Sequence, residues 1–398
     1  MEKTFKDFIR HLLPLRKKHR QELKLLKSIL TNDQLSDVKY LLKTKKIGLT
    51  DSATNISKKL TSISSIKHFN ALVEEVPILT LIKDLNNIIR EDSFEKSYKK
   101  FSLHAQERMI HYIAPNILGM DDIKQAALLQ LFSKERFHLL LLGDPGTGKT
   151  DILRGSSALS PISSFGLGSG TSGAGLSVSM SGKEVQKGLL LLANDGLCCI
   201  DELNLMKKAD RAALYSAMEK GIVTYDKGST HKSFKANVRI LATANPTGDR
   251  FVGKSLSIIQ QQVPFDSALL SRFHLVYVVR KPGLQELVSI TRKIIKSSAT
   301  RLREEDIEYL RGYVERAHQL DVEFDKHHAT LIANFIEDAK RNEANYLVEI
   351  GPRLVHGIMR MAQARARMLF RTKTEEQDVK EAINLVEQSL VIDGVTRA

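Results

Sequence analysis

Residues Gly143 to Thr150 have the sequence Gly-Asp-Pro-Gly-Thr-Gly-Lys-Thr, and this stretch decides the fold. It satisfies the full phosphate-binding loop pattern, because two glycines frame the loop and a lysine and a threonine follow the second one. The apolar run 137–142 before it is typical of a buried strand, and residues 152–159 suit the helix that should come next. Backbone N–H groups at such a helix N-terminus bind phosphate. The nucleotide contacts that we predict are Gly143, Asp144, Pro145, Gly146, Thr147, Gly148, Lys149 and Thr150.

The lysine and the threonine of this loop have separate expected roles, and two acidic residues later in the chain are expected to complete the catalytic site. We expect Lys149 to reach the β and γ phosphates of ATP, and Thr150 to offer its hydroxyl to Mg²⁺. A second apolar run, residues 197–200, ends in Asp201 and Glu202 about 50 residues after the loop, at the strand end where α/β sheets bind ligands. Asp201 would hold Mg²⁺ through water, and Glu202 would orient and polarise the attacking water.

Three more polar residues lie where they can act on phosphates. Asn245 closes the run Ile240-Leu-Ala-Thr-Ala, so its amide can hold the γ-phosphate or the lytic water, although Asn-Pro is also an ordinary turn. Arg272 precedes another apolar run and can stabilise transition-state charge on a neighbouring subunit's ATP. Arg353 opens a long helix after Gly351-Pro352 and can be a second phosphate sensor; the alternative for Arg272 is a surface position. The predicted catalytic residues are Glu202, Asn245, Arg272 and Arg353, and the predicted Mg²⁺ site is Thr150 with Asp201.

The bulk composition excludes several classes of protein. The chain has 398 residues, of which 42% are apolar, so two or three globular domains are expected. No apolar run approaches the ~20 residues that cross a bilayer, and the first residues lack the apolar core of a secretory signal. We therefore expect a cytoplasmic protein with no membrane partner, associated with the nucleoid in a prokaryote. Cys198 and Cys199 are adjacent, so neither a disulfide framework nor a zinc site is expected.

The charge is basic and concentrated near the start of the chain. The formal net charge is +14, and residues 1–100 hold 21 lysines and arginines against 12 aspartates and glutamates. Such an excess favours nucleic acid through phosphate contacts and counterion release, although many basic proteins bind none. The charge therefore favours a nucleic-acid partner without identifying it.

Three regions differ in pattern. Residues 1–100 contain only Gly48 as glycine and show apolar residues at helical spacing, which predicts a basic, mainly α-helical N-terminal domain and a polar linker near 93–101. Residues 104–282 alternate short apolar runs with helical patterns, which predicts a P-loop core with a parallel sheet and flanking helices. The apolar residues of segment 283–398 recur at helical spacing, which predicts a helical lid. The expected strands are 137–142, 197–200, 238–243 and 275–279, and the Gly- and Ser-rich segment 155–182 is either a flexible linker or short strands and turns inserted into the core.

These motifs, in this order, resemble the minichromosome maintenance (MCM) family of hexameric DNA helicases over residues 104–398. The resemblance implies an α/β AAA+ P-loop core with inserted hairpins, and ATP with Mg²⁺ as ligands. It implies a ring, which we expect to be a hexamer, in which Arg272 and Arg353 act across a subunit boundary. The matching segments are Ile113-Ala-Pro-Asn-Ile-Leu-Gly119, Gly168-Ser-Gly-Thr-Ser-Gly-Ala-Gly-Leu176, Ala193-Asn-Asp-Gly-Leu-Cys-Cys-Ile-Asp-Glu202, Ala217-Met-Glu219, Ala244-Asn-Pro246, Ser271-Arg-Phe273 and the lid segment 375–390.

The resemblance also implies where the chain would contact DNA. Two hairpins would face a central channel, near residues 177–187 and near residues 223–234. Lys227 lies where the family places a DNA-contacting hairpin lysine; Lys183, Lys232 and Lys235 are further candidates from charge and position. The alternative is that all four are ordinary solvated lysines. The expected partner is DNA, single- or double-stranded, bound without sequence preference.

The chain also departs from the family pattern. We expect its first hundred residues to lack the family's oligonucleotide-binding barrel and zinc module, and no winged-helix tail is expected after the lid. The segment after Glu202 is Leu-Asn-Leu-Met where the family has Phe-Asp-Lys-Met, the acid after Ser-Arg-Phe is replaced by His274, and the first hairpin is shorter. Two alternatives stay open. One is a protein remodeller or chelatase-like motor, and the other is an accessory paralogue that binds DNA or a partner without unwinding.

Overall fold

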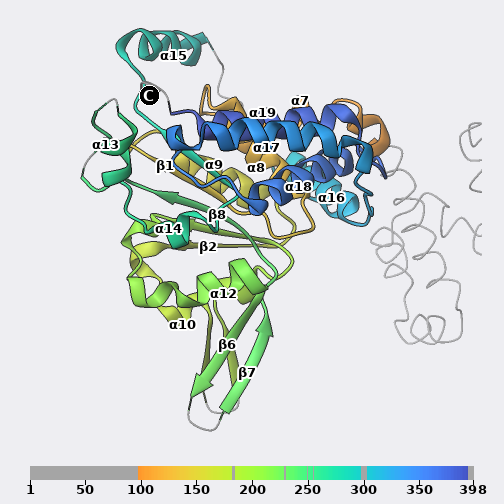
Figure 1. The fold of residues 1–398 in the computed structure, drawn as a ribbon. Helices are drawn as coiled ribbons and strands as arrows, with labels where there is room; N and C mark the ends of the chain where they lie inside the picture. Colours follow the sequence, from red (N-terminus) through yellow and green to blue (C-terminus); the bar gives the residue numbers. More distant parts are fainter. Residues whose placement is uncertain are drawn as a thin grey trace, which may run out of the picture. The chain divides into compact units, whose positions relative to one another are not determined.

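The computed structural model describes residues 97–392, except residues 182–183, 228–229, 249, 254 and 297–302. Residues 101–398 form a unit of their own, and the fold below is that of its described part (Figure 1). The predicted basic, helical N-terminal domain lies outside the described residues, apart from residues 97–100. Those four residues are helical.

A parallel sheet forms the centre of the described unit. Its strand order is β2-β5-β8-β1-β9, and each neighbouring pair runs parallel. Strands β1, β5 and β8 are buried at every residue, as parallel strands covered on both faces are. The predicted α/β core is confirmed. The bounds are Leu139–Gly143 for β1, Ser163–Leu167 for β2, Leu197–Asp201 for β5, Arg239–Ala244 for β8 and Leu275–Val279 for β9.

Helices pack around this sheet and bring the site residues to its edge. α8 is buried over most of its length, and α9 follows β1 directly and packs against β5 and β8. In Figure 1, α10 and α12 lie below the strands of the sheet, whereas α7 lies above them. The bounds are Ala105–Ile113 for α7, Asp121–Phe132 for α8, Lys149–Leu159 for α9, Gly173–Leu176 for α10, Leu189–Leu192 for α11, Ala212–Lys220 for α12, Leu256–Gln261 for α13 and Ser267–Leu270 for α14.

The predicted helical lid follows β9 and packs back onto the core. The Tyr277 hydroxyl of β9 donates to the carbonyl of Leu385 at 3.0 Å, and Arg367 donates to the carbonyl of Phe132 at 2.7 Å. None of the helices among the described residues is long and apolar enough to cross a bilayer. The helices after β9 are α15, Leu284–Lys296; α16, Glu304–His318; α17, Ala329–Arg341; α18, Pro352–Met368; and α19, Glu376–Leu390.

The Gly- and Ser-rich segment is structured, so the linker interpretation is wrong. It contains the end of α9, the strand β2, the helix α10 and the start of a hairpin. That hairpin pairs β3 (Val178–Ser181) with β4 (Glu184–Lys187), and a second one pairs β6 (Ile222–Lys227) with β7 (Thr230–Lys235). Both hairpins lie where the resemblance placed them. The β6–β7 hairpin projects away from the sheet (Figure 1).

Candidate nucleotide-binding site

The phosphate-binding loop joins the end of β1 to the start of α9, as its pattern predicts. Gly148 has a φ of +85°, in the left-handed region that glycine enters without strain. Its neighbour Lys149 is the first residue of the helix, so the backbone N–H groups of the loop and first turn stay free to meet an anion. The fold therefore builds the phosphate cradle that the sequence predicts.

Lys149 is buried within this loop. Its ammonium donates to the carbonyls of Gly143 and Asp144 at 2.8 and 2.7 Å, and to the Thr147 hydroxyl at 3.3 Å. Burial lowers the pKa of Lys149 to about 8, while Asp144, Asp201 and Glu202 oppose the shift. A charged phosphate beside the ammonium would raise that pKa again, because an opposite charge favours the protonated form.

Asp144 was predicted to contact nucleotide, but its side chain points into the protein and bonds to other parts of the backbone. Its carboxylate is buried and accepts hydrogen bonds from the backbone N–H of Phe251 at 2.7 Å and of Lys281 at 2.9 Å. Both oxygen atoms are therefore used to tie the loop to the segments after β8 and β9. The side chain of Asp144 therefore holds the loop in shape, and neither Gly143 nor Asp144 lines the cavity beside the loop.

The two residues predicted to hold Mg²⁺, Thr150 and Asp201, lie in contact at the carboxyl end of β5. The Thr150 hydroxyl lies 3.2 and 3.0 Å from the two carboxylate oxygens of Asp201. The hydroxyl of Thr243 on β8 donates to Asp201 at 2.5 Å and accepts from the backbone N–H of Glu202 at 2.9 Å. Hydroxyl and carboxylate oxygens are ligands that suit Mg²⁺, so these residues fit the metal that the site implies.

Glu202 and Asn245 line the same cavity as the loop. This cavity has a volume of about 200 Å³, and Lys149, Asp201 and Thr243 also line it. Glu202 has a φ of +54°, a left-handed conformation that costs a non-glycine residue on the order of 1–3 kcal/mol and that clusters at active sites. The backbone N–H of Asn245 donates to the Asn204 side chain at 3.0 Å. The structure thus brings the predicted acid and amide to one place.

Thr243 and Asn204 are the residues here that sequence reasoning missed. Thr243 was visible as a polar residue within an apolar buried strand, two positions before Asn245. Asn204 was noted only as a departure from the family pattern. Its side-chain oxygen accepts a hydrogen bond from the backbone N–H of Asn245, the predicted sensor.

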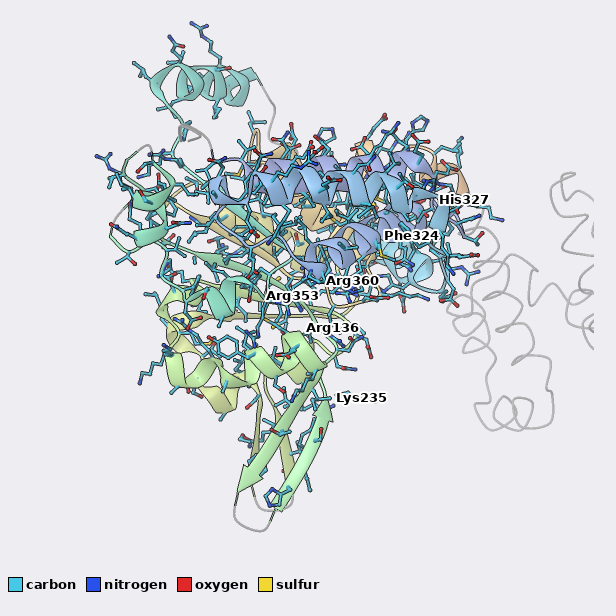
Figure 2. All side chains as sticks on the ribbon, viewed as in Figure 1. Arg136, Lys235, Phe324, His327, Arg353 and Arg360 are labelled. Atoms are coloured by element: carbon cyan, nitrogen blue, oxygen red, sulfur yellow. The ribbon has the colours of Figure 1, made fainter. Side chains whose placement is uncertain are left out.

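The two predicted arginines lie together, and neither lines this cavity. Arg272 pairs with Glu219 at 3.1 Å and stacks over the Tyr215 ring at 4.8 Å. The Arg353 guanidinium donates to the carbonyl of Ser271, next to Arg272. Figure 2 shows Arg353 between α18 and α12, with Arg360 and Arg136 nearby. Within one chain, the acid and the loop are thus separate from the arginines.

His274, which replaces the family's acid, is buried behind these arginines. Its Nδ1 accepts from the backbone N–H of His138 at 3.0 Å, and its Nε2 lies 2.9 Å from the guanidinium of Arg360. Burial lowers the pKa of His274 well below its ordinary value, and the neighbouring His138 and Arg360 act in the same direction. The ring is therefore neutral, and it contacts the lid helix α18 without an ion pair.

Three of the four predicted DNA-contacting lysines lie in the β6–β7 hairpin. Lys183 lies outside the described residues. Lys227 is the last residue of β6 and pairs with Thr230, and Lys232 pairs with Tyr225, so both occupy register positions on the same face of the hairpin. Lys235 pairs with Ile222 and occupies the opposite face. Lys232 and Lys235 are exposed, and Figure 2 shows Lys235 near the base of the hairpin.

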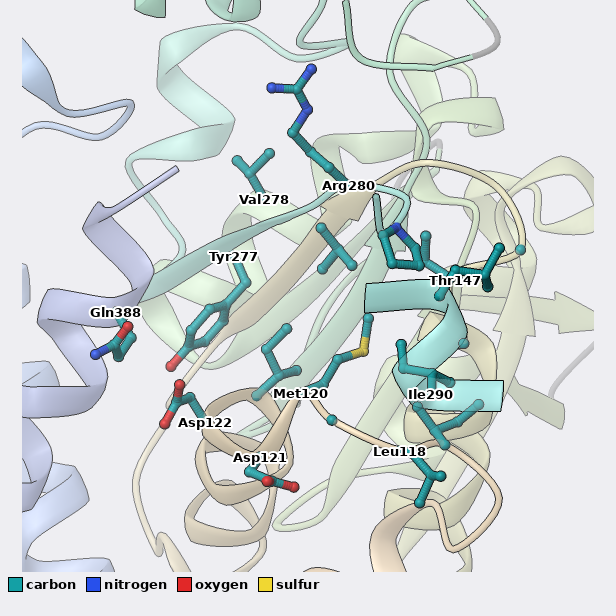
Figure 3. A pocket seen from close by; sticks show the side chains of 18 of the residues that line it. Leu118, Met120, Asp121, Asp122, Thr147, Tyr277, Val278, Arg280, Ile290 and Gln388 are labelled. Carbon is teal, nitrogen blue, oxygen red and sulfur yellow. The ribbon is translucent and has the colours of Figure 1, made fainter. Parts of the chain in front are cut away.

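A second, larger cavity adjoins the loop, and sequence reasoning did not anticipate it. Its volume of about 770 Å³ is in the range of small-molecule sites. Gly146, Thr147 and Gly148 border one side, and the segment Asn116–Ile123 borders another. Figure 3 shows Leu118, Met120, Tyr277 and Ile290 around the space. A nucleotide whose phosphates lie on the loop would place its base and ribose here.

Comparison with known proteins adds to this geometry. The chain matches the model of the MCM P-loop domain over residues 93–297 and the model of the MCM AAA-lid domain over residues 308–390. It is 28% identical over 333 residues to the DNA replication licensing factor mcm7 of Xenopus tropicalis, covering 77% of this chain and 44% of that protein. It is 32% identical over 310 residues to the DNA replication licensing factor MCM4 of Arabidopsis thaliana, covering 70% and 36%. It is 26% identical over 339 residues to the minichromosome maintenance protein MCM of Saccharolobus solfataricus, covering 79% and 49%. The chain thus spans less than half the length of each of these relatives.

Proposed function

Because the chain belongs to the minichromosome maintenance (MCM) family, we propose that it is an ATPase that hydrolyses ATP between the subunits of a ring and uses that energy to move on, unwind or remodel DNA. The observation that carries the ATPase part is the single cavity lined by Lys149, Thr150, Asp201, Glu202 and Asn245. These five side chains supply the cation, the metal ligands, the acid and the amide that phosphoryl transfer needs.

Each residue has its own role in this proposal. Lys149 and the loop N–H groups hold the β and γ phosphates of ATP. Thr150 and Asp201 would hold Mg²⁺, and the ion would neutralise charge on those phosphates. Glu202 orients the attacking water and polarises it toward the γ-phosphorus, and Asn245 holds the γ-phosphate or that water. The bond between the β–γ bridging oxygen and the γ-phosphorus breaks as water attacks, which gives ADP and phosphate.

The proposed ring rests on the separation, within one chain, between the phosphate-binding cavity and the two arginines. Arg272 and Arg353 lie together and do not line the cavity of their own chain. Cations that contact the γ-phosphate accelerate its transfer by ~10³ or more in related systems. We propose that the neighbouring copy supplies this pair of arginines, and that the ring is a hexamer.

The DNA part of the proposal rests on charge and on the projecting hairpin. Lys232 and Lys235 are exposed on β7, and the whole chain carries a net charge of +14. Contacts from lysines to backbone phosphates bind DNA without sequence preference. Lys227, Lys183, Lys232 and Lys235 are our proposed contacts, and residues 1–100, 104–282 and 283–398 our proposed domains.

The test is ATP turnover of the purified chain, with and without single-stranded and double-stranded DNA, at low and physiological salt. We expect DNA to stimulate turnover, and the Glu202→Gln variant to lose both the basal and the stimulated rate. Turnover that ignores DNA would overturn the DNA part and favour the protein-remodelling alternative. A folded protein without turnover under all these conditions would overturn the ATPase part.

A further inference from the structure

One wall of the larger cavity contains two consecutive residues with left-handed backbone conformation. The segment Ile117–Met120 borders the cavity, and two consecutive residues of it are left-handed, with a φ of +81° at Gly119 and +57° at Met120. Met120 has no glycine freedom, so its conformation costs free energy that neighbouring contacts must offset. The wall is therefore held in place by interactions outside itself.

Ile117 links this wall to the phosphate-binding loop. A methyl group built on Gly148 would lie 2.7 Å from Cδ1 of Ile117, so the two residues are in direct contact. Both border the larger cavity. A shift of Ile117 would change the shape of the cavity next to the loop, while Lys149 keeps its own hydrogen bonds to Gly143 and Asp144.

Lys124 is the group that fixes Ile117. It lies on α8 with only 5% of its surface exposed, and its ammonium donates to the backbone carbonyl of Ile117. Burial lowers the pKa of Lys124, and the nearby carboxylate of Asp121 opposes the shift. Lysines are seldom this buried without a specific partner. Here the partner is one carbonyl of the cavity wall.

We propose that Lys124 is a positioning residue for the nucleotide: its hydrogen bond to the Ile117 carbonyl sets the wall against which the base and ribose lie. Lys124 does not itself line the cavity, so it acts through Ile117. This inference rests on the proposed function, because it takes the ligand to be ATP with its phosphates on the loop. Loss of this hydrogen bond should weaken the binding of the base and ribose and leave the binding of the phosphates unchanged.

The experiment compares two ligands that differ by the nucleoside. Binding of ATP and of inorganic tripolyphosphate, each with Mg²⁺, is measured by titration calorimetry for the native chain, Lys124→Met and Lys124→Arg. Methionine keeps the length of the side chain without the donor, and arginine keeps a donor. Lys380→Met is the matched control, because Lys380 lies on the lid surface, where it pairs with Glu376.

We expect Lys124→Met to weaken ATP binding about tenfold, the effect of one lost hydrogen bond, while tripolyphosphate binding changes less than about twofold. Lys124→Arg should recover most of the ATP affinity, and Lys380→Met should match the native chain. An equal loss for both ligands, or no loss for either, would overturn the inference. Should Lys124→Met fail to fold, Ile117→Ala tests the same wall without a buried charge, and an unchanged ratio of the two affinities would overturn it.

The proposed function fails in a different way in the same experiment. If the native chain binds neither ATP nor tripolyphosphate, the proposed nucleotide site itself is wrong. If the native chain binds both, and the ratio of affinities does not respond to Lys124→Met, the site stands and only the role of Lys124 is wrong.

Discussion

Asp201 is oriented by two hydroxyl groups, and the one from β8 offers the sharper test. Thr243 donates to Asp201 at 2.5 Å from the adjacent strand. Groups that orient a metal ligand contribute about 10–100-fold to metal affinity. We therefore expect Thr243→Val to raise the Mg²⁺ concentration for half-maximal ATP turnover by about 10–100-fold.

The control for this prediction is Thr243→Ser, which keeps the hydroxyl and should stay near the native Mg²⁺ requirement. Valine has nearly the shape of threonine but leaves the backbone N–H of Glu202 without its partner, so far-ultraviolet circular dichroism must first show that the variant is folded. If the Mg²⁺ dependence of Thr243→Val equals that of the native chain, Thr243 does not orient the metal ligand.

Substitutions of Lys149 and Glu202 should have different effects on ATP binding and on ATP turnover. Removing the ammonium of Lys149 takes away the cation that the phosphates need, so Lys149→Ala should lose ATP binding together with turnover. Glu202→Gln keeps a side chain of the same size, so it should bind ATP while turnover falls about 10²–10⁴-fold. Nucleotide binding and steady-state turnover of both variants check this, and a Glu202→Gln protein with near-native turnover would refute the assignment.

The sequence predicts which residues act on the nucleotide better than it predicts the hydrogen-bond partners of those residues. The spacing of the loop and the two acids after an apolar run are local patterns, so Lys149, Thr150, Asp201 and Glu202 could be named. The bond from Thr243 to Asp201 joins residues 42 positions apart, and the bonds of Asp144 reach as far as Lys281. Such partners depend on strand order, which no single motif carries.

At the scale of elements, the lid depends on one buried carboxylate. Asp378 of α19 has no exposed surface; it accepts from Arg365 at 2.7 Å, from Arg371 at 2.6 Å and from the backbone of Glu375 at 2.8 Å. Breaking a buried ion pair from one side costs up to about 3–5 kcal/mol, and the two partner arginines of Asp378 keep 14% and 23% of their side chains exposed. Asp378→Ala should therefore lower the free energy of unfolding by about that amount.

The matched control is Asp338→Ala on the exposed surface of α17. Asp338 lies 3.9 Å from Arg341 with 74% of its side chain exposed, and exposed pairs contribute about 0–1 kcal/mol. Urea unfolding followed by far-ultraviolet circular dichroism measures both variants. Equal losses for Asp378→Ala and Asp338→Ala would contradict the role given to the buried carboxylate.

The elements were predictable where burial gives them a strong pattern. Strands β1, β8 and β9 are apolar runs, and each was expected within two residues of its observed bounds. The edge strand β2, Ser163–Leu167, has the sequence Ser-Ser-Phe-Gly-Leu and is partly exposed. Its pairing with β5 makes it a strand, and that pairing cannot be seen in five residues of this composition. The lid helices were found because their apolar faces repeat at helical spacing.

Buried His138 and half-buried His318 should make the stability of the whole fold decrease in acid. Burial lowers the pKa of His318 from 6.5 to about 4 and that of His138 to about 3. Between these values and pH 6.5 the unfolded chain binds protons that the folded chain does not, so the free energy of unfolding falls as the pH falls.

The His318 share of this effect can be isolated. The Nε2 of His318 lies 2.6 Å from the carbonyl of Leu131, and glutamine can keep a donor there without titrating. From pH 7 to pH 5, the native chain should lose about 2 kcal/mol more stability than His318→Gln. Urea unfolding at the two pH values measures this, and identical losses would mean that the fold does not keep the half-buried His318 ring neutral.

We propose that a second copy of the chain completes each catalytic site, because Arg272 and Arg353 do not line the cavity of their own chain. The most direct test mixes Arg272→Ala subunits, which have an intact loop, with Lys149→Ala subunits, which have an intact arginine. Each variant alone should have little ATP turnover. In mixed assemblies, some interfaces pair an intact Lys149 with an intact Arg272 from the neighbour, so we predict that turnover reappears on mixing. No recovery in assemblies shown to contain both variants would contradict the claim and place Arg272 outside the shared site.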